Sequence, residues 1–232
     1  MENSAFVGVS LDSSEFCRDW IRYAVEHLLS RHRDIEFVFG DRLLEYNKTA
    51  RQDGGRASVD FIAAASKIAK RRNDVRLCLE SEVRRLSPSD QLRVTVKLWD
   101  HYSDAVCSNL ARKLTIAYSV IPEFRSCVDH DVEAHFVKHL EVHTNPETGR
   151  HLCSRYVLEE TAMIIRITEL AGRPFDYYPG EQIETLRSIY QDQFSADGLS
   201  LQTLIGRQKS RIFTPLYLNS MACQRFGSSA GE

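Results

Sequence analysis

Alternating apolar and polar positions mark three short strands in the first hundred residues, over 5–10, 35–41 and 92–99. Between the first two, apolar residues recur at helical spacing from Phe16 to Leu28, after candidate N-cap residues at 12–14. A long helical pattern over about 58–86 separates the second strand from the third. This alternation of strands and helices predicts a parallel α/β sheet with right-handed connections.

The chain beyond residue 100 carries mainly helical patterns. They cover 104–120, 122–142 and 150–171, and they are interrupted at Pro122 and at the turn-rich segment 144–149. The segment 173–180 contains two prolines and a glycine, which predicts a loop. The pattern beyond Ser210 assigns no element, and the small polar residues 227–232 favour a disordered tail.

The composition is that of an ordinary globular protein. The chain has 232 residues, of which 43% are hydrophobic and 27% charged, so we expect a single domain over 1–232. No basic segment followed by an apolar one marks a signal peptide, and no apolar run approaches the ~20 residues that span a bilayer. The six cysteines form no C-x-x-C pair. We therefore expect a cytoplasmic protein with reduced thiols and no membrane association.

The net charge of −2 argues against a generally basic nucleic-acid binder, but local charge decides such binding. One basic concentration lies on the long predicted helix, where spacings of three and four residues align the side chains in a stripe. Such a stripe can follow the phosphates of RNA, and the alternative is a solvated helix face. Its members are Lys67, Lys70, Arg71, Arg72 and Arg76.

Ser10 stands at the carboxyl end of the first predicted strand, directly before a predicted helix. Ligands of open parallel sheets bind at that edge, and Gly8 leaves room for a substrate to approach. Ser10 is therefore a candidate nucleophile, with helix capping as the alternative. The nucleophile-elbow pattern G-x-S-x-G is not met, because Asp12 stands in place of the second glycine.

Tyr156 and Glu160 are four residues apart on a predicted helix and share one of its faces. A carboxylate beside a phenol suits recognition of an ammonium group, and an exposed helical pair is the alternative. The apolar residues Met163, Ile164 and Ile165 place this helix in the core, which favours a pocket.

Histidines recur every fourth residue at His135, His139 and His143, but the zinc-binding pattern H-E-x-x-H is absent. We interpret them as surface histidines and expect no metal. The chain also lacks a P-loop and the pattern G-x-G-x-x-G, so no nucleotide cofactor is expected.

Taken in order, these features resemble the cyclodipeptide synthases. They are Gly8-Val9-Ser10, the second-strand run Phe37-Val38-Phe39-Gly40-Asp41 with Leu43, Leu44 and Asn47, the basic helix, Tyr156-Val157-Leu158-Glu159-Glu160, and Tyr178-Pro179. Ser13 and Pro179 are similar to the family branch that has Tyr-Pro and no asparagine three residues after the serine. The resemblance implies a Rossmann-like parallel sheet flanked by helices, similar to the catalytic domain of class I aminoacyl-tRNA synthetases.

The resemblance also implies ping-pong acyl transfer from two aminoacyl-tRNAs to a diketopiperazine, without cofactor or metal, by a monomer. Ser10 would carry the aminoacyl and dipeptidyl groups, Tyr156 and Glu160 would hold the α-amino group, and Tyr178 would assist proton transfer or hold the dipeptide. The basic helix would bind the first tRNA.

Substrate contacts are expected at Gly8, Phe6, Val38, Ser13 and Pro179, and the first side-chain pocket should also involve Val96 and Leu98 of the third strand. A serine hydrolase of α/β type and a catalytically inactive tRNA-binding module remain alternatives.

Overall fold

The computed structural model describes residues 3–11, 15–40, 57–140, 146–191, 194–196, 199–206, 208 and 210–218. Its centre is a five-stranded sheet in the order β3-β2-β1-β4-β7, in which every neighbouring pair is parallel. The fold is therefore the predicted α/β Rossmann-like one. The strands are β1 (Ala5–Val9), β2 (Ile35–Phe39), β3 (Val94–Leu98), β4 (Phe175–Tyr178) and β7 (Ile212–Pro215).

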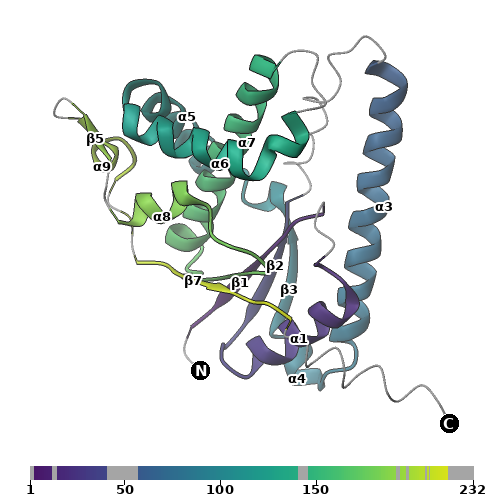
Figure 1. Cartoon of the computed structure of the whole chain (residues 1–232). Helices are drawn as coiled ribbons and strands as arrows, with labels where there is room; N and C mark the ends of the chain where they lie inside the picture. Colours follow the sequence, from purple (N-terminus) through teal and green to yellow (C-terminus); the bar gives the residue numbers. More distant parts are fainter. Residues whose placement is uncertain are drawn as a thin grey trace.

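Helices cover both faces of this sheet, with α1 and α3 on one side and α5, α6 and α7 on the other (Figure 1). The main helices are α1 (Arg18–Leu29), α3 (Ala57–Val83), α5 (Ala105–Val120), α6 (Pro122–Leu140), α7 (Pro146–Ile165) and α8 (Glu184–Tyr190). The shorter elements are α4 (Pro88–Gln91), η1 (Trp99–His101), η2 (Arg166–Leu170), α9 (Leu201–Ile205), β5 (Ser195–Ala196) and β6 (Leu199–Ser200).

Strand periodicity divides the core into two layers. Val7 and Val9 of β1 pack with Trp20 of α1 and Leu79 of α3, whereas Phe6 faces the cluster formed by α5, α6 and α7. The second face is not purely apolar, because Phe6 lies in register with Glu36 on one side and Asp176 on the other. Both carboxylates are almost completely buried, at 1% and 4% exposure. Charged groups in such a position must be paired, so this face is a place to look for chemistry.

The segment predicted as a loop at 173–180 contains a strand, so that prediction is wrong. Residues Phe175–Tyr178 form β4, which pairs with β1 on one side and with β7 on the other. The strand is only four residues long and follows Pro174, so its period-two pattern is too short to outweigh the turn-forming residues around it. As a result, Tyr178 ends a central strand instead of lying on a loop.

The predicted helix at 150–171 is also modified. It begins at Pro146, inside the segment predicted as a turn, and changes at Arg166 into a π-helical stretch. The strands and helices predicted before residue 121 occur as expected, apart from shifts at their ends. None of the helices in the described part of the chain is long and apolar enough to cross a bilayer.

Candidate active site

Ser10 and Tyr178 meet at the carboxyl edge of the sheet. Ser10 directly follows β1 and Tyr178 is the last residue of the neighbouring parallel strand β4. The Ser10 hydroxyl lies close enough to the Tyr178 phenol to act on its pKa. The N-cap residue of α1 is Cys17, so Ser10 does not cap that helix, and α1 does not begin directly after it as expected. The candidate nucleophile is thus positioned by two adjacent strands.

Close packing fixes the ring of Tyr178. The Phe16 ring lies 5.9 Å away between centroids, and a Cβ added at Gly8 would meet the Tyr178 ring at an ordinary 3.8 Å. A Cβ added at Gly180 would come within 2.9 Å of the same ring, which is too close for an alanine without movement. Glycine at position 180 therefore makes room for the ring beside Ser10.

The Tyr178 phenol is a hydrogen-bonding group at neutral pH. Desolvation and the nearby Glu160 raise its pKa to about 12, although the neighbouring Ser10 hydroxyl acts in the opposite direction. A phenol with that pKa stays protonated under physiological conditions. Tyr178 can therefore donate a hydrogen bond at the position of Ser10, and a phenol with this pKa is not poised to accept a proton as a phenolate.

Glu160 is the titratable group of this site. Desolvation is the largest cause that raises its pKa, and the charges of Asp176 and Asp131 add to it, against the opposing charge of Arg211. The resulting pKa is about 7. The side chain still keeps part of its surface accessible. Such a carboxyl group can change its protonation when a charged substrate binds.

Tyr156 lies one helical turn before Glu160 on α7, is half-buried and packs against the core of the α5–α7 layer. The structure thus keeps the predicted Tyr156–Glu160 pair on one helix and brings its Glu160 end into electrostatic contact with Tyr178.

The predicted pocket residues divide between the two faces of the sheet. Phe6 and Val38 are buried in the layer that contains α7, as a pocket beside Glu160 requires. Val96 packs with the opposite layer. Leu98 lies two residues further along β3, on the same side of the strand as Val96, and is 39% exposed. The prediction of a first side-chain pocket is therefore wrong for Val96 and Leu98, because side chains alternate between faces along a strand.

Of the other residues predicted to contact the substrate, Gly8 and Pro179 lie in the described part of the chain and Ser13 does not. Gly8 lies on β1 with its Cα beside Val38 in the register, and Pro179 is buried directly after β4. Ser13 lies outside the described residues, as do Asp41, Leu43, Leu44 and Asn47 of the second-strand motif.

The basic stripe lies on α3, as expected. Arg71 is half-buried and its Nη2 donates to the backbone carbonyl of Phe16 at 3.4 Å, which joins α3 to the segment that packs on Tyr178. Arg72 is half-buried, and Lys70 and Arg76 are exposed. Lys67 belongs to the same helix, and its side chain lies outside the description, as do the side chains of His135, His139 and His143.

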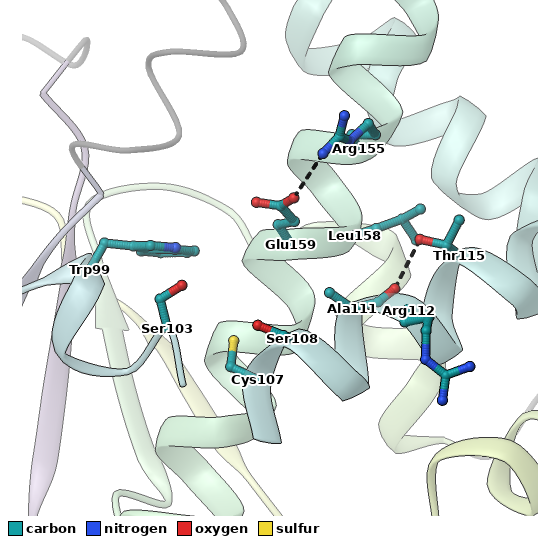
Figure 2. A pocket seen from close by; sticks show the side chains of 10 residues that line it. All are labelled: Trp99, Ser103, Cys107, Ser108, Ala111, Arg112, Thr115, Arg155, Leu158 and Glu159. Carbon is teal, nitrogen blue, oxygen red and sulfur yellow. Dashed lines mark hydrogen bonds and ion pairs between the residues drawn. The ribbon is translucent and has the colours of Figure 1, made fainter. Parts of the chain in front are cut away.

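A recess of about 250 Å³ lies between η1, α5 and α7 (Figure 2). Trp99 and Cys107 line it on one side, and the ion pair between Arg155 and Glu159 closes another. Ser10, Tyr156, Glu160 and Tyr178 do not line it. Glu159 therefore faces different surroundings from its neighbour Glu160 and provides a matched control for it.

Sequence reasoning missed Asp176, Arg211, Phe16 and Gly180 as residues that shape this site. The sequence predicts a loop around Asp176, and its buried partner Arg211 is 35 residues away in a segment for which the sequence pattern predicts no element. Among the described residues, no group of three side chains suits a metal ion.

The fold and the site define a Rossmann-like α/β protein with a serine and a tyrosine paired at the carboxyl edge of the sheet. No protein-family model matches the sequence, and no curated protein matches it. Solved structures do match. The cyclodipeptide synthase AlbC from Streptomyces noursei gives a TM-score of 0.64 at 13% identity, covering 97% of this chain and 100% of that one.

Two further structures extend the likeness. One is a Mycobacterium tuberculosis protein whose structure is described as demonstrating that cyclodipeptide synthetases are related to type I tRNA synthetases. It matches with a TM-score of 0.65 at 21% identity, covering 86% of this chain and 82% of that one. A cyclodipeptide synthase from Candidatus Glomeribacter gigasporarum, bound to Phe-tRNAPhe, has a TM-score of 0.67 at 16% identity over 95% and 91%. The TM-scores show a shared fold, and at identities of 13–21% they show the fold alone.

Proposed function

We propose that this chain is a tRNA-dependent cyclodipeptide synthase acting as a single catalytic domain over 1–232. One observation carries the proposal: the Ser10 hydroxyl lies beside the Tyr178 phenol and near the titratable Glu160, in a fold shared with structurally characterised cyclodipeptide synthases. Ser13 and Pro179 favour the branch that has Tyr-Pro and lacks the asparagine. Its substrates would be two aminoacyl-tRNAs, encountered in the cytoplasm by a monomer.

In the proposed reaction, the Ser10 hydroxyl attacks the ester carbonyl of the first aminoacyl-tRNA. An ester forms on Ser10, the ribose oxygen leaves with a proton, and free tRNA is released. The amine of a second aminoacyl-tRNA would then attack this ester, which returns the Ser10 hydroxyl. Attack by that Ser10 hydroxyl on the second tRNA ester transfers the dipeptide to the enzyme. The dipeptide amine closes on the Ser10 ester and releases the cyclic product.

The electrostatics of the site support these roles. Ester exchange needs no input from nucleotide hydrolysis, because the substrate arrives activated. Glu160, with a pKa of about 7, would hold the α-ammonium of the first residue together with Tyr156. Tyr178 stays protonated and would donate a hydrogen bond, so the proton of Ser10 would pass to water, since the α-ammonium held by Glu160 has no lone pair to accept it. Gly8 would leave space above β1, with Phe6 and Val38 beneath it.

The proposal is tested by expressing the chain in bacteria and analysing the medium for cyclic dipeptides by mass spectrometry. We expect one or a few diketopiperazines that are absent with Ser10→Ala, since that variant has no group to carry the acyl chain. Soluble wild-type protein without any new cyclic dipeptide would contradict the proposal and favour an inactive tRNA-binding module.

The basic stripe gives a second expectation. Replacing Arg71 and Arg72 together with alanine should weaken tRNA binding about tenfold at low salt and flatten its salt dependence, because fewer counterions are released. Arg84 and Arg85, exposed near the other end of α3, serve as the charge-matched control pair. Filter-binding titrations over a range of salt concentrations would measure both effects. If both double variants lost the same tRNA affinity, the basic stripe would be an ordinary solvated helix face and not a tRNA-binding surface.

A further inference from the structure

A buried ion pair lies on the face of the sheet that α7 covers, and both of its charges act on Glu160. Asp176 of β4 pairs with the guanidinium of Arg211, which directly precedes β7. The two side chains are 5% and 2% exposed. Asp176 lies two residues before Tyr178 on the same strand and in register with Phe6 of the layer that contains α7, whereas the Tyr178 ring at the end of the strand packs on Phe16. The pair thus joins β4, which carries Tyr178, to the start of β7.

Arg211 is held rigidly in this position. Its guanidinium lies 5.6 Å from the ring centroid of Tyr190 and 5.6 Å from that of Phe213. The backbone of the next residue, Ile212, donates to the carbonyl of Pro174 at 2.9 Å, which begins the pairing of β7 with β4. Aromatic contacts on the guanidinium and a locked backbone leave it little freedom to move away from Asp176.

The other carboxylates that act on Glu160 already have partners of their own. Asp131 of α6 accepts hydrogen bonds from the backbone N–H groups of Glu184 and Thr185, at 2.8 and 2.7 Å, at the start of α8. Asp176 is matched by Arg211, and Tyr178 is neutral at physiological pH. The two other carboxylates that act on Glu160 thus each have a partner, although burial still raises the pKa of Asp176 in spite of Arg211.

We propose that Arg211 is a positioning residue for Glu160: by neutralising Asp176, it leaves Glu160 as the carboxyl group that ionises to receive the α-ammonium of the substrate. The proposal rests on the function proposed above for Glu160. Without Arg211, two carboxyl groups would share one low-dielectric region, and one of them would retain its proton. A protonated Glu160 offers no charge to an ammonium group.

Two single variants should move the ionisation of Glu160 in opposite directions. Arg211→Met leaves Asp176 uncompensated and should raise the midpoint of the Glu160 titration by about one pH unit. Asp176→Asn leaves an unmatched cation and should lower it by about as much. The double variant Asp176→Leu with Arg211→Met removes both charges and should return the midpoint close to that of the wild type. A purely structural role for the pair would not produce opposite shifts.

The test needs no tRNA in its first part. In each background, the unfolding free energy is measured against pH with and without the substitution Glu160→Gln, and the pH dependence of the difference reports the midpoint. If Arg211→Met does not fold, Asp176→Asn and the double variant still decide the matter. Unmoved midpoints in the folded variants, or shifts of the same sign in Arg211→Met and Asp176→Asn, would overturn the proposal.

The second part measures transfer from aminoacyl-tRNA to Ser10 at several pH values. With Arg211→Met we expect KM at pH 7 to rise about fivefold, because a midpoint raised by about one unit lowers the ionised fraction of Glu160 from about one half to about one tenth, and to recover at higher pH, with a smaller effect on kcat. If transfer stayed normal and the Glu160 midpoints did not move, the role proposed for Arg211 would be overturned and the proposed function would stand. Opposite midpoint shifts without any Ser10 adduct in the wild type would keep the electrostatic assignment and remove the proposed function.

Discussion

Glu160→Gln is expected to lower aminoacyl transfer and to stabilise the fold at alkaline pH. The variant keeps the size of the side chain but loses the charge that would hold the substrate ammonium. A hydrogen bond to a charged group contributes roughly 1.5–3 kcal/mol, so transfer should fall about 10- to 100-fold. Initial rates of Ser10 aminoacylation at a fixed, low concentration of aminoacyl-tRNA would measure the loss.

The stability effect follows from the raised pKa of Glu160, which is about 7 in the folded chain against an ordinary 4.5. Between these values the folded state binds more protons than the unfolded state, so wild-type stability should fall as pH rises through this window. The penalty is complete above pH 7. It should be on the order of 2 kcal/mol after allowance for the solvent that reaches the side chain. Glu160→Gln removes it, so the variant should be more stable than the wild type at pH 8 and similar at pH 4.

Glu159→Gln is the matched control, because Glu159 precedes Glu160 on α7 and pairs with the half-exposed Arg155 at 3.5 Å. Such surface pairs contribute little, so its unfolding free energy should stay within about 1 kcal/mol of wild type at every pH. Urea denaturation at pH 4, 6 and 8 would give all these values. If the curves of Glu160→Gln and the wild type ran parallel over this range, Glu160 would not be the group described here.

Gly180→Ala should impair catalysis far more than folding. The added Cβ would lie 2.9 Å from Cε1 of the Tyr178 ring and 3.1 Å from Cδ1, so the ring must shift and carry its hydroxyl away from Ser10. Gly180 does not lie in the left-handed region, so alanine causes no backbone strain there. A displacement approaching 1 Å at a reacting group costs up to about 100-fold in rate. The expected result is a 10- to 100-fold loss of product with nearly unchanged thermal stability.

A double-mutant cycle with Tyr178→Phe isolates this cause. If Gly180→Ala acts by moving the Tyr178 hydroxyl, then adding it to Tyr178→Phe should cause little further loss. Losses that multiply independently would show that Gly180 acts by another route. Gly8→Ala is a control for folding only, since its Cβ would meet the same ring at an ordinary 3.8 Å.

The first half of the fold is readable from the sequence because its strands are regular and well separated. The strands at 5–10, 35–41 and 92–99 alternate clearly, and the helices between them leave few other topologies. β4 and β7 are different, because each has four residues and prolines within or beside it. A segment of that length becomes a strand through pairing with distant neighbours, and that pairing leaves no local pattern.

The candidate site divides in the same way. Ser10, Tyr156 and Glu160 come from local positions and from the resemblance, whereas the contact of Ser10 with Tyr178 depends on β4 lying next to β1. The pair of Asp176 and Arg211 is invisible without the sheet, because neither residue stands in a recognisable motif. The first side-chain pocket was misjudged at Val96 and Leu98 because the register of β3 decides which of its residues face α7.

The central claim is that Ser10 carries the substrate as an ester. Purified protein incubated with a single aminoacyl-tRNA and quenched in acid would be analysed by intact-mass and peptide mass spectrometry. The expected result is an increase equal to one aminoacyl group, located on Ser10 and absent from Ser10→Ala. An unmodified Ser10 while cyclic dipeptide accumulates, or rapid hydrolysis of simple esters without any tRNA, would contradict it.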